Sequence, residues 1–223
     1  MPYARDLSAF PLRRFAEVLA TVELIPSRRI LADHIADVAA RLETNGVSDL
    51  EALRKLLASK ERYDRLSRQL GVDADYLTLL NREVNSYKTK PVPLAKLEYL
   101  TDSELAALDG AGISSTRALY DRCADKRDRL ALTEELGIKI TRLDEVLRLA
   151  NLVRINGVGP AFARFFLDLG VLGPEDVRAI ATDEIIRRYE ASIADDPDQP
   201  RLLDEDIQYC KRYCEGLQDD IEW

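Results

Sequence analysis

The chain has 223 residues, of which 46% are hydrophobic and 32% are charged, and its formal net charge is −8. This composition excludes a disordered or fibrous protein and is sufficient for one or two domains with hydrophobic cores. No apolar run approaches the ~20 residues that a membrane-spanning helix needs, and the first residues do not resemble a secretory signal. We therefore expect a cytoplasmic protein without membrane contact.

Cysteine and histidine are scarce in this chain. There are 3 cysteines and 1 histidine, and the cysteines lack the spacing of metal ligands. We expect the cysteines to be buried or neutral thiols, and we expect no metal site and no cofactor. Cys210 and Cys214 are four residues apart, which places them one turn apart on a helix and disfavours a disulfide between them.

Negative charge is concentrated at the C-terminal end. Residues 195–223 carry 10 acidic and 3 basic side chains, whereas the preceding residues are close to neutral. A near-neutral body permits contacts to phosphates but does not provide the broad basic face of a strong duplex-binding protein.

Apolar residues at helical spacing open the chain. Leu7, Phe15 and Leu19 belong to a predicted helix over residues 7–23, and a second predicted helix runs from Ser27 to Asn45-Gly46. Glycines punctuate the helical stretches, and no stretch alternates in the way that strands do. The sequence predicts an all-α fold.

An internal repeat divides the chain. Residues 45–85 align without gaps on residues 111–151, with 12 identical pairs among 41 positions, and the offset is 66 residues. Residues 86–93 contain two prolines and indicate an extended linker between repeat units. We predict four segments: 1–85, an N-terminal helical repeat unit; 86–93, a linker; 94–194, a second repeat unit; and 195–223, an acidic linker with a C-terminal amphipathic helix.

A glycine hairpin lies within the second unit, at residues 152–167. Leu152 and Ile155 have helical spacing, Gly157 and Gly159 then predict backbone angles that other residues avoid, and Pro160 suits the first turn of a new helix. The order helix, glycine turn, helix places several backbone amides at the start of the second helix. Such amides favour an anion.

This hairpin resembles the helix-hairpin-helix motif of DNA repair and replication proteins. Together with the repeats and the linker, it also makes residues 10–192 similar to the bacterial domain of unknown function 4332. The resemblance implies tandem helical repeats built from helix-hairpin-helix units, but no activity. It further implies that four backbone amides face a phosphate and that three carbonyls hold a monovalent cation. The amides are those of Gly157, Val158, Gly159 and Ala161; the carbonyls are those of Val153, Ile155 and Val158.

Two arginines flank the hairpin. Arg154 and Arg164 are candidate phosphate ligands, although each also fits an ordinary solvated arginine. Ala161 stands where DNA-binding versions of the motif often carry Lys or Arg, and Phe162 makes the site more apolar than a phosphate requires. These departures make packing about as good an explanation of the hairpin as phosphate binding.

No arrangement of catalytic residues is present in the sequence. Asp176 and Asp183 follow the hairpin at a distance that invites comparison with base-excision glycosylases, but the lysine nucleophile of those enzymes is missing. Both aspartates fit helix N-termini instead. We expect no catalytic residues and no enzymatic activity.

The final segment combines acidity with an apolar stripe. Residues 195–200 form a charged, proline-containing linker. Five apolar residues then recur at helical spacing: Leu203, Ile207, Cys210, Cys214 and Leu217. Three arrangements are open for this stripe. It completes the core of the repeats far from the hairpin, it covers the hairpin and competes with phosphate there, or it docks into the groove of a partner protein. We predict the first arrangement, because terminal units of helical stacks need a polar-backed cap.

Two functions remain open at this point. The first is weak, sequence-independent contact with a DNA or RNA backbone through residues 154–164. The second is that of an adaptor that binds proteins through the groove between repeats or through the tail helix.

Overall fold

The computed structural model describes residues 3–22, 24, 26–194 and 201–223. Its regular secondary structure is helical, and the described residues contain only isolated β-bridges besides helices. The predicted all-α fold is confirmed. None of the described helices is both long enough and apolar enough to cross a lipid bilayer.

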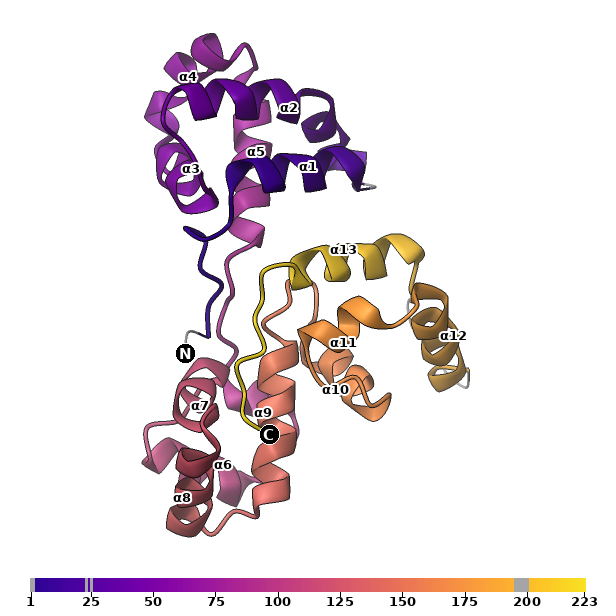
Figure 1. Ribbon diagram of the computed structural model, residues 1–223. Helices are drawn as coiled ribbons and strands as arrows, with labels where there is room; N and C mark the ends of the chain where they lie inside the picture. The colour runs from indigo at the N-terminus through magenta and orange to yellow at the C-terminus, as the bar shows by residue number, and fades with distance from the viewer. Residues whose placement is uncertain (1–2, 23, 25, 195–200) are drawn as a thin grey trace. The chain divides into compact units, whose positions relative to one another are not determined.

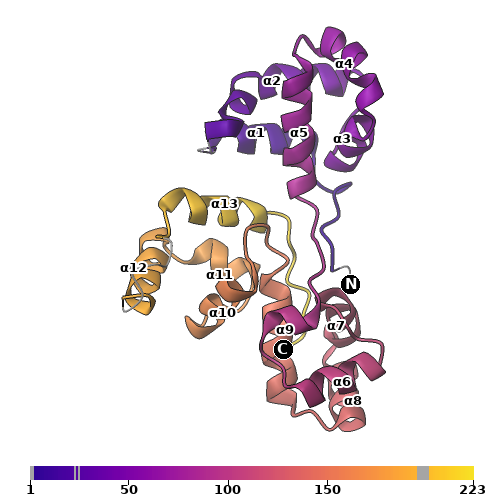
Figure 2. The same cartoon turned by 180° about the vertical axis from the view of Figure 1, so that it is seen from behind.

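The chain divides into two compact units, which differ from the four predicted segments (Figures 1 and 2). One unit comprises residues 6–88; the other comprises residues 89–223 together with residues 1–5 at the start of the chain. We call them the 6–88 unit and the 89–223 unit. The tail helix therefore belongs to the second unit, while the predicted linker at 195–200 lies outside the described residues.

The described residues of the 6–88 unit form five α-helices: α1 (Leu12–Thr21), α2 (Arg29–Thr44), α3 (Leu50–Leu57), α4 (Tyr63–Leu70) and α5 (Ala74–Ser86). Two short 3₁₀ helices, η1 (Pro26–Arg28) and η2 (Lys60–Arg62), precede α2 and α4. The first helix is shorter than predicted, because Pro11 adopts an extended conformation and caps it. Helix α1 packs on α2, and an ion pair joins the partly buried Arg28 to the buried Glu83 in α5.

The 89–223 unit begins with η3 (Leu94–Leu97). Outside the undescribed residues 195–200, eight α-helices follow: α6 (Asp102–Gly110), α7 (Thr116–Cys123), α8 (Lys126–Leu136), α9 (Ile140–Leu152), α10 (Pro160–Asp168), α11 (Pro174–Ala179), α12 (Thr182–Ser192) and α13 (Asp204–Cys214). Helix α9 contacts α7, α8 and α10, and α13 lies against α11 and α12 (Figure 1).

The helices of the two predicted repeat copies are separated by the same offset, 66 residues, as the aligned sequences. Helix α3 and helix α7 begin 66 residues apart, as do α5 and α9. Gly71 ends α4 with φ of 71°, and Gly137 ends α8 with φ of 68°; this left-handed conformation is one that glycine adopts without strain. That the two segments arose by duplication stays a prediction.

Both ends of the described chain are built into the 89–223 unit. The Tyr3 hydroxyl lies 2.8 Å from the Thr116 hydroxyl, and the Arg5 guanidinium donates to the Tyr213 carbonyl in α13. At the other end, the Glu222 amide donates to the Ala124 carbonyl at 2.9 Å. The segment after α13 thus runs back along α9 (Figures 1 and 2).

Candidate functional site

The predicted hairpin is a tight turn between α9 and α10. Leu152, Ile155 and Val158 are buried and anchor the turn in the core of the 89–223 unit. The Val158 amide donates to the Ile155 carbonyl at 3.0 Å, which closes the turn. This bond occupies one of the amides predicted to face a phosphate, so Val158 does not fit that role.

The two hairpin glycines have different conformations. Gly157 has φ of 92°, as predicted, whereas Gly159 has φ of −81° and ψ of 175°. The prediction for Gly159 is wrong because Pro160 follows it, and a residue before proline is held in the extended region. Gly159 is the N-cap of α10, and a β-carbon at this position would have no heavy atom within 4 Å apart from those of its chain neighbours.

Alanine substitutions are expected to separate the two glycines. Gly157→Ala should destabilise the chain by about 1 to 3 kcal/mol, because a β-carbon there would be strained and would lie 3.0 Å from Tyr209 Cδ1. Gly159→Ala should leave the melting temperature almost unchanged. Thermal unfolding followed by circular dichroism measures the stability of both variants. Equal destabilisation by the two substitutions would contradict the different backbone conformations of Gly157 and Gly159.

Arg154 is buried, with 4% of its surface exposed. Its Nε donates to the Tyr3 carbonyl at 2.9 Å, and its Nη1 donates to the Asn151 side chain at 2.7 Å and the Gln218 carbonyl at 3.0 Å. The guanidinium also lies 4.6 Å from the centre of the Tyr120 ring. The predicted phosphate contact of Arg154 is wrong, because these bonds engage it inside the core.

Arg164 is exposed on α10. Its guanidinium forms an ion pair with Asp168 at 3.4 Å and lies 4.4 Å from the centre of the Tyr99 ring. The aromatic ring fixes the direction of the side chain, and an exposed ion pair of this kind holds the charge only weakly. Of the two predicted arginines, Arg164 alone is accessible to a phosphate.

A hollow of about 670 Å³ opens beside the N-terminus of α10. It is lined by Lys96, Leu97, Glu98, Pro160, Ala161 and Arg164. Within the described part of the chain, the backbone amides of Gly159 and Ala161 have no hydrogen-bond acceptor. The structure therefore brings these two amides together with Arg164. It adds Lys96, which sequence reasoning missed because η3 lies some sixty residues before α10.

The predicted phosphate contact of the Gly157 amide and the predicted cation ligands of the hairpin stay predictions. The Gly157 amide has no acceptor among the described residues. Of the three predicted cation ligands, the Ile155 carbonyl accepts the Val158 amide, and the Val153 and Val158 carbonyls make no hydrogen bond within the described residues. Gly157 and the cation ligands thus remain candidates.

The tail helix α13 lies against the hairpin rather than far from it. The Asn156 side chain donates to the Tyr209 hydroxyl at 2.8 Å. Four of the five predicted stripe residues are buried, namely Ile207, Cys210, Cys214 and Leu217, whereas Leu203 is 56% exposed. In the structure these four residues pack on the body, and Leu203 does not. The predicted distance from the hairpin is wrong, because α13 packs on α11 and α12, which follow directly from α10.

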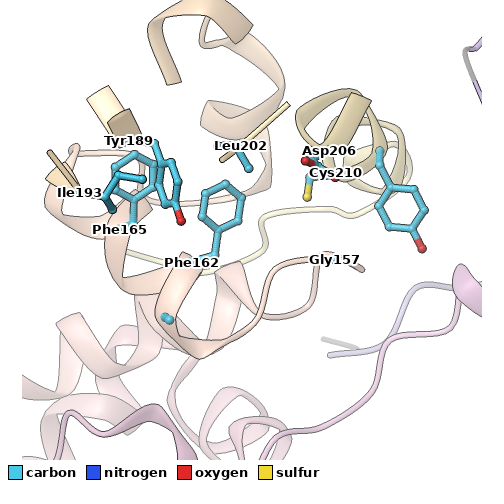
Figure 3. A pocket seen from close by; sticks show the side chains of 10 residues that line it. Gly157, Phe162, Phe165, Tyr189, Ile193, Leu202, Asp206 and Cys210 are labelled. Atoms are coloured by element: carbon cyan, nitrogen blue, oxygen red, sulfur yellow. The ribbon is translucent and has the colours of Figure 1, made fainter. Parts of the chain in front are cut away.

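A larger cavity, of about 720 Å³, lies between α10, α12 and α13 (Figure 3). Phe162 and Phe165 reach it from α10, Tyr189 from α12, and Asp206 from α13. Gly157 lies at its edge. The start of α10 thus borders two spaces, this apolar cavity and the hollow that contains Lys96, and Ala161 lines both.

Cysteine chemistry is suppressed by burial. All three cysteines are free and buried. Burial raises the pKa of Cys123, of Cys210 and of Cys214 to about 12, so these thiols are neutral near pH 7. Among the described residues, no three His, Cys, Asp or Glu side chains are grouped so as to hold a metal ion.

Residues 98–194 match the family model described as domain of unknown function, DUF4332. This segment belongs to the DUF4332 family. The DUF4332 segment contains α6 to α12 and the hairpin, and it ends before α13. The wider resemblance that the sequence predicts, from residue 10, stays a prediction for residues 10–97. Searches among curated proteins and among solved structures found no match to the chain.

Proposed function

We propose that this protein is a non-enzymatic nucleic-acid-binding protein in which the hairpin acts as a helix-hairpin-helix motif. The observation that carries the proposal is the hollow at the N-terminus of α10, where Lys96 and Arg164 line the same space as Pro160 and Ala161. A helix N-terminus attracts an anion through its unpaired amides and its dipole, and two cations add to that attraction.

The proposed contact is to the sugar–phosphate backbone and not to the bases. Backbone amides and two cationic side chains recognise the charge and spacing of phosphates, but they carry no information about base edges. Binding is expected to be weak, because Glu98 lines the same hollow and the chain as a whole carries a charge of −8.

Salt dependence is the direct test of phosphate contact. With two cations, the affinity for a fluorescein-labelled DNA duplex should fall about tenfold between 50 and 200 mM salt. Fluorescence anisotropy at both salt concentrations measures this. Two duplexes of unrelated sequence should bind with equal affinity, and absence of binding at 50 mM salt would end the proposal.

The chain supplies a matched control for Arg164. Arg188 has the same side-chain exposure, 45%, and forms the same kind of i,i+4 ion pair, with Glu184 on α12. Arg164→Ala should weaken duplex binding several-fold and lower the salt slope by about one, while Arg188→Ala should change neither. Equal effects of the two substitutions would mean that only the overall charge matters.

A protein-binding adaptor is the other candidate. The observation in its favour is the exposed side chain of Leu203, the N-cap residue of α13. A single exposed leucine is a common surface feature, and the other four stripe residues are already buried. The geometry therefore favours the nucleic-acid proposal over a docking tail helix.

A further inference from the structure

The apolar cavity beside the hairpin has the size of a small-molecule site. Its volume, about 720 Å³, lies within the range of about 300 to 1,000 Å³ typical of ligand pockets. The residues that line it include Phe162, Phe165, Tyr189, Ile193 and Asp206. Most of these are apolar or aromatic, as in such pockets generally.

Three aromatic rings form one wall of the cavity (Figure 3). The rings of Phe162 and Phe165 are nearly parallel, at 5° and 5.6 Å between centres, and the Tyr189 ring stands edge-on to Phe165 at 5.4 Å. All three side chains are partly exposed. Partly exposed aromatic faces carry negative partial charge and attract cations.

Asp206 provides the charge of the cavity. No lysine, arginine or histidine is among the described residues that line it, and Asp206 is the one carboxylate among them. Its Oδ2 accepts the Leu203 amide at 3.0 Å, while its Oδ1 has no hydrogen-bond partner within the described residues. Asp204 and Glu205 share the same helical turn and add to the negative field.

We infer that this cavity binds a small organic cation whose ammonium group meets Asp206 and whose apolar body lies against Phe162, Phe165 and Tyr189. A carboxylate or phosphate ligand would meet a like charge without a compensating cation, so this chemistry excludes fatty acids and nucleotides. The cavity shares Ala161 with the hollow that contains Lys96, but the two share no charged residue, and binding of the cation does not depend on nucleic-acid binding.

Three ligands that differ only in their head group test this inference on the full chain. Phenylbutylamine, phenylbutanol and phenylvalerate are a cation, a neutral alcohol and an anion with the same apolar body. Isothermal titration calorimetry should rank the amine first, about fivefold to tenfold tighter than the alcohol, with the carboxylate weakest. Equal affinity for amine and carboxylate, or no binding of the amine at millimolar concentration, would overturn the inference.

Two variants place the binding at this cavity. Asp206→Asn should reduce the affinity for the amine to that for the alcohol. Asp204→Asn is the control, because it makes the same change of charge on the same helical turn. Asp204 does not line the cavity, so this control should have little effect on amine binding. Phe162→Ala should weaken the amine and the alcohol alike. If Asp204→Asn and Asp206→Asn have equal effects, the cavity is not the site. Arg164→Ala, which tests the nucleic-acid proposal, should leave amine binding unchanged.

Discussion

Replacing Arg154 with alanine is expected to destabilise the 89–223 unit by about 3 to 5 kcal/mol, because several buried acceptors lose a charged donor at once. These acceptors include the carbonyls of Tyr3 and Gln218, which come from opposite ends of the chain. The loss should lower the melting temperature by roughly 10 °C or more. Fluorescence of Trp223 reports on this unit, since it is the single tryptophan and its ring lies 3.8 Å from the Arg148 guanidinium carbon.

Arg164→Ala is the control for this prediction. Both substitutions replace an arginine with alanine, but Arg164 is exposed. Exposed ion pairs such as the one between Arg164 and Asp168 contribute about 0 to 1 kcal/mol to the free energy of unfolding. Arg154→Lys should fall between the two, because a lysine keeps the charge but lacks the planar set of donors. Similar unfolding curves for Arg154→Ala and Arg164→Ala would show that the bonds of Arg154 contribute little.

Truncation after Ala194 is expected to abolish the native fold of the 89–223 unit. It removes Ile207, Tyr213 and Leu217, which are buried, and each such side chain contributes about 1.5 to 3 kcal/mol by leaving water. Whole domains have net stabilities of only about 5 to 15 kcal/mol. Limited proteolysis with mass spectrometry should find new cleavage sites in α10 to α12, while α1 to α5 stay protected.

Point substitutions on α13 refine the truncation experiment. Ile207→Ala removes a fully buried side chain and should destabilise the chain by about 2 to 5 kcal/mol. Leu203→Ala, at the N-cap of the same helix, truncates a residue that is 56% exposed and should change the unfolding midpoint little. A truncated chain with unchanged protease resistance would show that the tail is not part of the core.

The tail also bears on the proposed binding of nucleic acid. Residues 195–223 carry 10 acidic and 3 basic side chains, and α13 approaches the hairpin at Gly157. The Leu203→Ala and Ile207→Ala variants keep this charge, so any change in DNA affinity that they cause arises from the position of the helix. Tighter binding by the less stable variant would indicate that α13 opposes the nucleic acid.

Local chemistry made the helical elements predictable from the sequence. Glycines at 71 and 137 adopt left-handed conformations at helix ends, and Pro160 begins α10, because these residues constrain the backbone wherever they occur. Apolar periodicity likewise predicted the burial of Ile207, Cys210 and Leu217. The same local logic indicated a turn at Gly157 and amides at the start of the next helix.

The tertiary structure alone decided which of these groups are accessible. Arg154 and Arg164 look alike in the sequence, ten residues apart on either side of the turn. One is buried by Tyr3 and Gln218, from distant parts of the chain, and the other is exposed beside Lys96. Periodicity shows that a helix has a face to bury, but not against which element. The position of α13 beside Gly157, and the cavity this position creates, depend on that long-range packing.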